Sequence, residues 1–193
     1  NNTKTKDHRI IKPGNFSGNY IHYGVREHAM CGIMNGISLH SNLIPYGGTF
    51  LIFSDYCKPS IRLSAMMGQK VIFVFTHDSI GLGEDGPTHQ PVEQLMALRM
   101  VPNLVTMRPA DSRETLEAWK VALARTEGPS AIVLTRQGLP QLPLDAPVET
   151  GFARGGYRVL DADAPQIVLI GTGSEVSTAM EAAALLAEDA ISA

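Results

Sequence analysis

The chain has 193 residues and a formal net charge of -3, and 44% of its residues are hydrophobic while 18% are charged. This length allows one domain of ordinary size and part of a second, and the composition excludes a disordered chain and a membrane protein, because no apolar run approaches the roughly 20 residues of a spanning helix. The slightly acidic balance also excludes a broad cationic surface for nucleic acid.

The first regular element is expected after about residue 20. Residues 1–19 are polar and without periodicity, which predicts an N-terminal loop. Five apolar residues then recur at helical spacing: Ala29, Met30, Ile33, Met34 and Ile37. Because Gly32 and Gly36 lie among them, we expect a buried helix with a closely packed neighbour.

The next elements alternate between strand and helix. Residues 45–48 are typical of a turn, and residues 49–53 of either a short strand or the extended approach to a helix through Arg62 and Met66. Residues 71–75 are apolar on both faces, as a strand covered by helices on either side of a parallel sheet would be.

A helix over residues 91–100, with Pro91 in its first position, and a strand over residues 103–107 follow. Asp111 and Glu114 fit a capping box, so the next helix is predicted over residues 112–125.

Its apolar face should carry Leu116, Trp119 and Leu123. With a further strand at residues 131–135, the alternation indicates the α/β class, a parallel sheet flanked by helices, over residues 20–142.

A second domain is expected after a linker. Composition shifts to prolines, glycines and isolated charges, and we place the linker at residues 143–157. Residues 158–193 should then begin another α/β domain, with a strand at 166–170 and a helix at 175–187. Since a single such unit cannot bury its own sheet face, we expect this second domain to be truncated.

The densest cluster of reactive side chains lies in residues 76–91, directly after a buried strand. Ligands of parallel sheets bind beyond the carboxyl ends of strands, which favours a binding site; the alternative is a polar surface loop whose glycines merely turn the chain. His77, Glu84, Asp85 and His89 are all possible metal ligands, but their spacing fits no standard zinc pattern. An anionic, hydroxyl-rich substrate explains the same side chains, so no metal site is predicted.

Two glycine patterns resemble nucleotide motifs. Gly81-x-Gly83-x-x-Gly86 has the dinucleotide spacing, but Glu84 and Asp85 would repel a pyrophosphate. Gly171-x-Gly173 is followed by Val176 where a third glycine is needed, which favours an ordinary turn.

The two cysteines, Cys31 and Cys57, lie in apolar stretches without a metal-type spacing, and the N-terminal residues contain no apolar signal. We therefore expect a reduced, cytoplasmic protein.

Several segments, in order, resemble the transketolase family: Tyr23-Gly24-Val25-Arg26-Glu27-His28, Pro45-Tyr46-Gly47-Gly48-Thr49-Phe50, the loop at residues 77–91, Arg108-Pro109-Ala110-Asp111 and Thr135-Arg136-Gln137. The resemblance covers about residues 20–142, and Gly171-Thr172-Gly173-Ser174-Glu175 is similar to the opening of the family's third domain. The unbroken run at residues 83–91 favours transketolase over related thiamine diphosphate enzymes such as deoxyxylulose phosphate synthase.

The resemblance implies the pyrimidine-binding domain of the thiamine diphosphate-binding fold. It assigns Glu27 to activation of the cofactor, and Phe50, Phe53 and Tyr56 to the wall against its aminopyrimidine ring. Without the resemblance, Glu27 would be a solvated first-turn acid and the three rings ordinary core. The helix dipole would lower the pKa of Glu27 and burial would raise it, and the sequence leaves that balance open.

The resemblance also implies that His77 and Arg136 hold a substrate phosphate, that Asp85 binds a hydroxyl beside the ketose carbonyl, and that His89 acts close to the reacting carbons. The implied reaction moves a two-carbon unit from a ketose phosphate to an aldose phosphate in the pentose phosphate pathway.

The diphosphate and a Mg²⁺ or Ca²⁺ ion would be bound by the N-terminal domain of the other subunit of a homodimer, so this fragment alone is expected to be inactive. The alternative is a non-catalytic dimerisation or regulatory module of the same fold. Such a module would have no need of the reactive side chains assigned above.

Overall fold

The computed structural model of the chain describes residues 3–193. Asn1 and Asn2, the start of the expected N-terminal loop, lie outside the described residues. The rest of that loop is irregular and is held by two isolated bridges, Ile10 to Tyr20 and Lys12 to Asn15.

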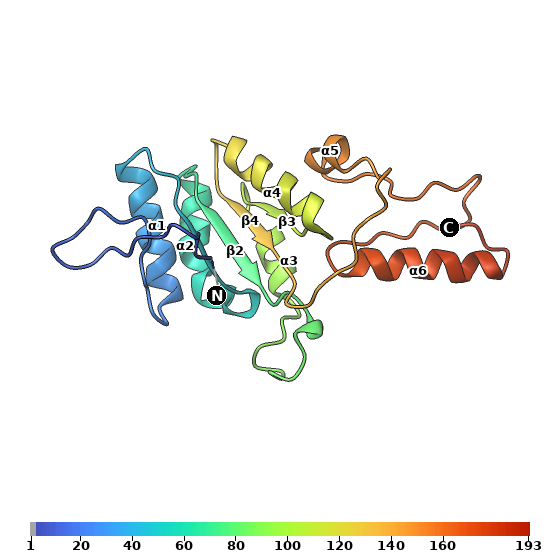
Figure 1. Cartoon of the computed structure of the whole chain (residues 1–193), viewed down its shortest axis with the longest axis horizontal. Coiled ribbons are helices and arrows are strands. Elements are labelled where there is room, and N and C mark those ends of the chain that lie inside the picture. Colours follow the sequence, from blue (N-terminus) through green and yellow to red (C-terminus); the bar gives the residue numbers. More distant parts are fainter. Residues whose placement is uncertain (1–2) are drawn as a thin grey trace.

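Strands and helices alternate through the middle of the chain (Figure 1). The strands are β1 (Tyr46–Phe50), β2 (Ile72–Thr76), β3 (Val105–Met107) and β4 (Ser130–Val133). The α-helices are α1 (Glu27–His40), α2 (Ser54–Met66), α3 (Gln94–Arg99), α4 (Ser112–Ala124), α5 (Val148–Gly151) and α6 (Glu175–Glu188), and short 3-10 turns lie at Leu51–Phe53, Ile80–Leu82 and Phe152–Arg154.

The strands of the described residues form one parallel sheet in the order β1-β2-β4-β3. Strand β2 is buried on both faces: Phe73 and Phe75 pack among core residues of α1, α2 and α3, whereas Ile72 and Val74 pack with the buried alanines of α4. The predicted α/β class, with a parallel sheet flanked by helices, is confirmed.

Strand β1 begins earlier than predicted. The expected turn at residues 45–48 is wrong, because Gly47 and Gly48 pair with Phe73 and Val74 of β2. A Cβ on Gly47 would lie 2.5 Å from the sulfur of Met34, so this glycine lets α1 lie close against the strand.

Three features that the sequence predicts for the helices also differ from the structure. Helix α3 begins at Gln94, and Pro91 precedes it in the loop. Helix α1 is buried on one side only: Met30 and Met34 are in the core, but Ile33 is 44% exposed. A Cβ on Gly36 would meet nothing within 4 Å, so no neighbour packs closely there within the described residues.

Helix α4 turns only part of the expected face to the core: Trp119 packs, partly buried, against the cluster that contains Ala118 and Ala122. Leu116 and Leu123 are at least half exposed, and Ala118 and Ala122 are buried instead. The small alanines allow α4 to lie close on the sheet, which the larger leucines would prevent.

The C-terminal segment contains the expected helix, α6, which lies well away from α1 (Figure 1). The strand expected at residues 166–170 does not form, because no strand of residues 3–193 lies beside it and only Gln166 and Ile167 donate backbone hydrogen bonds, both to Ser192.

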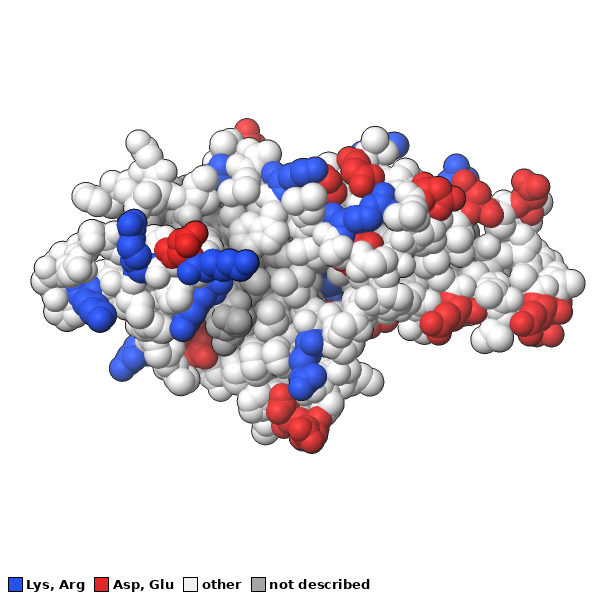
Figure 2. Space-filling view, in the orientation of Figure 1, with Lys and Arg blue, Asp and Glu red and all other residues white. Residues whose placement is uncertain are grey.

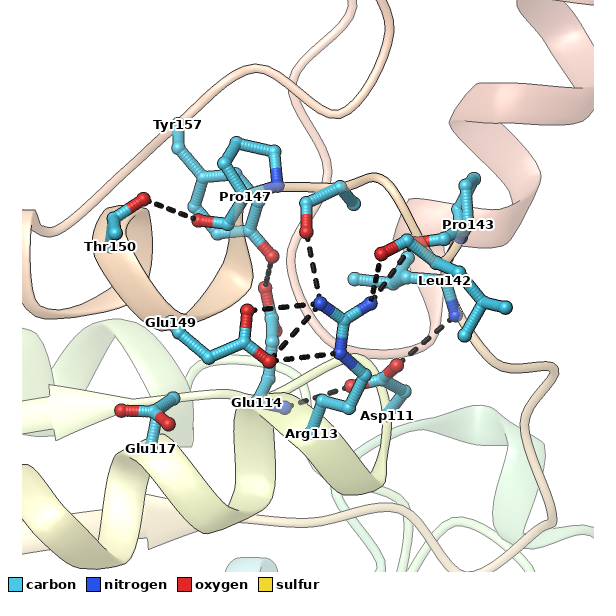
Figure 3. A network of polar contacts seen from close by, with 12 residues as sticks. Asp111, Arg113, Glu114, Glu117, Leu142, Pro143, Pro147, Glu149, Thr150 and Tyr157 are labelled. Atoms are coloured by element: carbon cyan, nitrogen blue, oxygen red, sulfur yellow. Dashed lines mark hydrogen bonds and ion pairs between the residues drawn. The ribbon is translucent and has the colours of Figure 1, made fainter.

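The segment expected to be a linker packs on the first turn of α4 (Figure 3). Arg113 donates hydrogen bonds to the carbonyls of Pro143 and Ala146 and forms an ion pair with Glu149, while the Tyr157 hydroxyl donates to Glu114. Division of the chain at residues 142 and 157 stays a prediction.

Figure 2 shows basic side chains mainly over the N-terminal part of this face and acidic ones mainly over the C-terminal segment. Across residues 3–193, no helix has both the length and the apolar character that spanning a membrane requires.

Candidate functional site

The predicted site residues follow three neighbouring strands. Phe50 is the last residue of β1, His77 directly follows β2, and Arg136 lies three residues beyond β4. Because these parallel strands are adjacent, with Phe50 opposite Thr76, their carboxyl ends lie at one edge of the sheet. In Figure 1 the loop after β2 projects from this edge.

Five aromatic side chains form one cluster there, which we call the aromatic wall: Phe50, Phe53, Tyr56, His77 and His89. Phe50 stacks on His77 with ring centroids 3.6 Å apart, and the ring centroids of Phe50 and Phe53 are 5.9 Å apart at an interplanar angle of 15°. Tyr56 continues this parallel series, and His89 meets Phe53 edge-on at 5.3 Å.

The wall is open to solvent. Phe50 and Phe53 are half-buried, and Tyr56 is 63% exposed. Parallel, partly exposed rings of this kind fit a flat aromatic ligand, since stacking contributes roughly 0.5 to 1.5 kcal/mol beyond burial. The alternative that these rings are ordinary core does not match their exposure.

His77 lies near enough to the other predicted substrate residues to be affected by their charges. Burial lowers the pKa of His77 below its ordinary value; Asp85 acts against that shift, and Arg136 and His89 add to it. These four side chains therefore lie within electrostatic range of one another. A His77 that is neutral at pH 7 can still donate one ring N–H to a phosphate oxygen.

The loop between His77 and Pro91 is held by its own polar contacts. The Ser79 hydroxyl caps the turn Ile80–Leu82, Gln90 donates to the Gly83 carbonyl, and Thr88 bonds the ring of His89. Gly83 and Gly86 both have positive φ, at 88° and 80°. They turn the chain, and the three-residue turn at Ile80 offers no helix N-terminus for a pyrophosphate.

Glu27 is the first residue of α1 and is half-buried. One turn later, a hydrogen bond with the free Cys57 thiol, together with burial, raises the pKa of Cys31. Cys57 in turn donates to the carbonyl of Phe53, so the first turns of α1 join the wall through this pair. Within residues 3–193 the Glu27 carboxylate makes no hydrogen bond or ion pair, which leaves it available to a ligand.

Two positioning contacts were not predicted. The buried Gln94 accepts from the Val92 N–H and donates to Asp55, which ties the end of the loop to α2. Asp78 is also buried and pairs with Arg108. Arg108 lies in a segment that carries the family resemblance, but no sequence pattern links it to Asp78.

The residues present fit the pyrimidine half of thiamine diphosphate: a wall of parallel rings and an unpaired carboxylate. The described residues do not fit a metal ion, because nowhere in residues 3–193 do three His, Cys, Asp or Glu side chains lie close enough together to form a metal site.

Comparison with known proteins agrees with this reading. Residues 1–141 match the family model for the transketolase pyrimidine-binding domain, and residues 155–193 match that for the transketolase-like C-terminal domain. A transketolase of Cereibacter sphaeroides is 55% identical over the whole chain, and one of Sinorhizobium medicae is 54% identical. The chain spans 29% and 28% of their lengths.

Among solved structures, a Pichia stipitis transketolase in complex with sedoheptulose-7-phosphate superposes with a TM-score of 0.94 and 46% identity, covering 98% of this chain and 29% of that one. A split gene transketolase, described as an inactive beta4 tetramer, covers 93% of this chain and 55% of that one, with a TM-score of 0.73 and 28% identity. The chain belongs to the transketolase family.

Proposed function

We propose that this chain forms the pyrimidine-binding part of a transketolase, whose full-length form transfers a two-carbon ketol unit from a ketose phosphate to an aldose phosphate in the pentose phosphate pathway. The observation that carries the proposal is the aromatic wall, which is open to solvent and lies beside the charges of Asp85 and Arg136. The related enzyme solved with sedoheptulose-7-phosphate supports a sugar phosphate as substrate.

Thiamine diphosphate, when bound, supplies the nucleophilic chemistry that cleaves the bond beside a ketose carbonyl. Phe50, Phe53 and Tyr56 orient its flat ring by stacking. Glu27 would hydrogen-bond the edge of that ring, as a group positioned for proton exchange does.

The substrate residues act by charge and hydrogen bonding. Arg136 offers a planar fork to phosphate oxygens, and a neutral His77 adds one N–H donor. Asp85 accepts a hydrogen bond from a sugar hydroxyl, and His89, at the edge of Phe53, exchanges a proton near the reacting carbons.

We also propose a cytoplasmic homodimer in which the N-terminal domain of the other subunit binds the diphosphate with Mg²⁺ or Ca²⁺. Apolar side chains exposed on the outer surfaces of α1 and α2 support burial against a second copy: Ile33, Leu39, Leu63 and Met66. The two cysteines of the chain are free and buried, in keeping with a reducing compartment.

The similarity to an inactive split-gene chain favours a second candidate for the 193 residues taken alone, a non-catalytic assembly module. We propose that the isolated chain lacks activity and that transfer requires the rest of the protein.

The test is two-carbon transfer by the full-length protein and its Glu27→Ala variant. We expect the variant to lose roughly 10²- to 10⁴-fold in kcat, the usual contribution of a positioned proton-transfer group. Glu181→Ala, an exposed position on α6, is the matched control and should retain full activity. Equal activity of the Glu27→Ala variant and the wild type removes the role of Glu27, and no transfer by the wild type removes the proposed function.

A further inference from the structure

Arg108 joins the loop at residues 77–91 to the C-terminal segment. Its Nε and one terminal nitrogen both lie 2.7 Å from Oδ2 of Asp78, whose side chain is fully buried. Its other terminal nitrogen donates to the Thr172 carbonyl at 2.9 Å and pairs with Glu175. The guanidinium thus has a carboxylate on each side, one from each segment.

The turn at residues 171–174 is shaped around this arginine. The Gly173 N–H donates to the Arg108 carbonyl at 3.0 Å, and a Cβ on Gly173 would lie 2.8 Å from Arg108 Nε. Gly173 has a φ of 58°, so a side chain there would be strained as well as crowded. The absence of a side chain at Gly173 therefore leaves room for the Arg108 guanidinium.

Asp78 directly follows His77, which has a φ of 60°. The left-handed region costs a residue with a side chain roughly 1 to 2 kcal/mol, so the surrounding structure must hold it there. On one side of His77, Thr76 is fixed by pairing of β2 with Phe50. On the other side, Asp78 is held by its contact with Arg108, and the His77 ring itself is hydrogen-bonded to the Thr76 hydroxyl at 2.9 Å.

Resting on the proposed function, we propose that Arg108 is a positioning residue for substrate phosphate. By holding Asp78 it keeps the backbone of His77 left-handed and the imidazole against Phe50, within electrostatic range of Arg136. Because Arg108 is itself held by Thr172 and Glu175, docking of the C-terminal segment controls this geometry.

A purely structural role would give a different result. Arg113 provides the comparison, because it also ties the later part of the chain to α4, through Pro143, Ala146 and Glu149 (Figure 3). None of these partners adjoins His77. Loss of either arginine should weaken packing, but only loss of Arg108 should alter phosphate binding.

The experiment uses the full-length protein and measures kcat and KM with a phosphorylated ketose and with an unphosphorylated one. For Arg108→Gln we expect KM for the phosphorylated ketose to rise about tenfold, as for one lost charge-assisted contact of about 1.4 kcal/mol. KM for the unphosphorylated ketose and kcat should change less than about twofold. Arg108→Lys keeps the positive charge but cannot contact Asp78 and Glu175 at once through a planar guanidinium. Its KM for the phosphorylated ketose should therefore lie between those of the wild type and Arg108→Gln.

Glu175→Gln is a milder variant that tests the proposal if Arg108→Gln does not fold. For Glu175→Gln we expect a smaller rise in KM for the phosphorylated ketose and no change in KM for the unphosphorylated one. Arg113→Gln should lower the melting temperature and change neither KM. A crystal structure of Glu175→Gln gives a readout independent of activity, with His77 expected to leave the left-handed region.

Equal changes in both KM values, or an unchanged His77, overturn the proposal. Absence of two-carbon transfer by the wild type instead refutes the proposed function, and the crystal structure then still decides the role of Arg108.

Discussion

His77 depends on neighbours from three separate parts of the chain. Phe50 of β1 stacks on its ring, Arg136 after β4 acts on its charge, and Asp78 is held by Arg108 at the end of β3. A histidine in an isolated loop would sample many rotamers. Here the sheet and its loops select one orientation, which is the preorganisation that a binding site needs.

The aromatic wall makes a prediction at this scale. Phe50→Leu keeps an apolar side chain but loses ring stacking, so we expect the dissociation constant of thiamine diphosphate from the full-length protein to rise between about twofold and tenfold, for a loss of roughly 0.5 to 1.5 kcal/mol. Phe16→Leu, at a ring that is 76% exposed in the N-terminal loop, is the control and should bind as the wild type does. Unchanged binding by Phe50→Leu would remove that ring from the site.

Helix α4 shows how one element serves two purposes. The Asp111 side chain caps the helix by accepting from the Glu114 N–H at 2.8 Å, as predicted, but Glu114 bonds the Ala110 N–H and not that of Asp111. The second oxygen of Asp111 accepts from the Leu142 N–H at 3.1 Å. The same residue therefore starts the helix and fixes the chain that leaves β4.

Asp111→Ala should lower the free energy of unfolding by about 2 kcal/mol, since a lost cap costs about 1 kcal/mol and the buried Leu142 N–H is left without its acceptor. Asp111→Asn keeps an acceptor for the cap and should lose less than half as much. Urea unfolding of the full-length protein measures both variants. Equal losses for the two variants would contradict this account.

Across the whole molecule, the C-terminal segment is attached by an apolar cluster, in which Val176 and Met180 of α6 pack on buried residues near Ala110, and by the charged contacts of Arg108. Burial alone would raise the pKa of Glu175, but its hydrogen bonds to Arg108 and Ser174 outweigh burial and lower that pKa below the ordinary 4.5. A carboxyl group with a depressed folded pKa stabilises the fold above its unfolded pKa. That stabilisation is lost as the pH falls through the folded value.

We therefore expect the melting temperature of the full-length protein to exceed that of Glu175→Gln at neutral pH, and the difference to shrink once the pH falls below about 4.5. In an Arg108→Gln background the difference should be small at every pH, because the partner is gone. A gap that is constant with pH in the wild-type background would contradict this linkage.

The sequence by itself determined the fold class, the cap of α4 and the family. These features depend on local patterns: a strand apolar on both faces, an acid three residues before another, and long unbroken motifs around Glu27 and residues 83–91. Each is read within a few residues of chain, so no distant contact is needed to recognise it.

Only the tertiary structure decided which surfaces are buried and what holds the site. Leu116 was expected inside and lies outside, while Ala118 and Ala122 are buried, because the face that α4 turns to the sheet is set by the packing of the whole helix and not by its most apolar residues. The strand at residues 166–170 did not form, because a strand requires a neighbour. The contact of Asp78 with Arg108 joins residues 30 positions apart, and no local pattern records a pairing that depends on where two strands end in space.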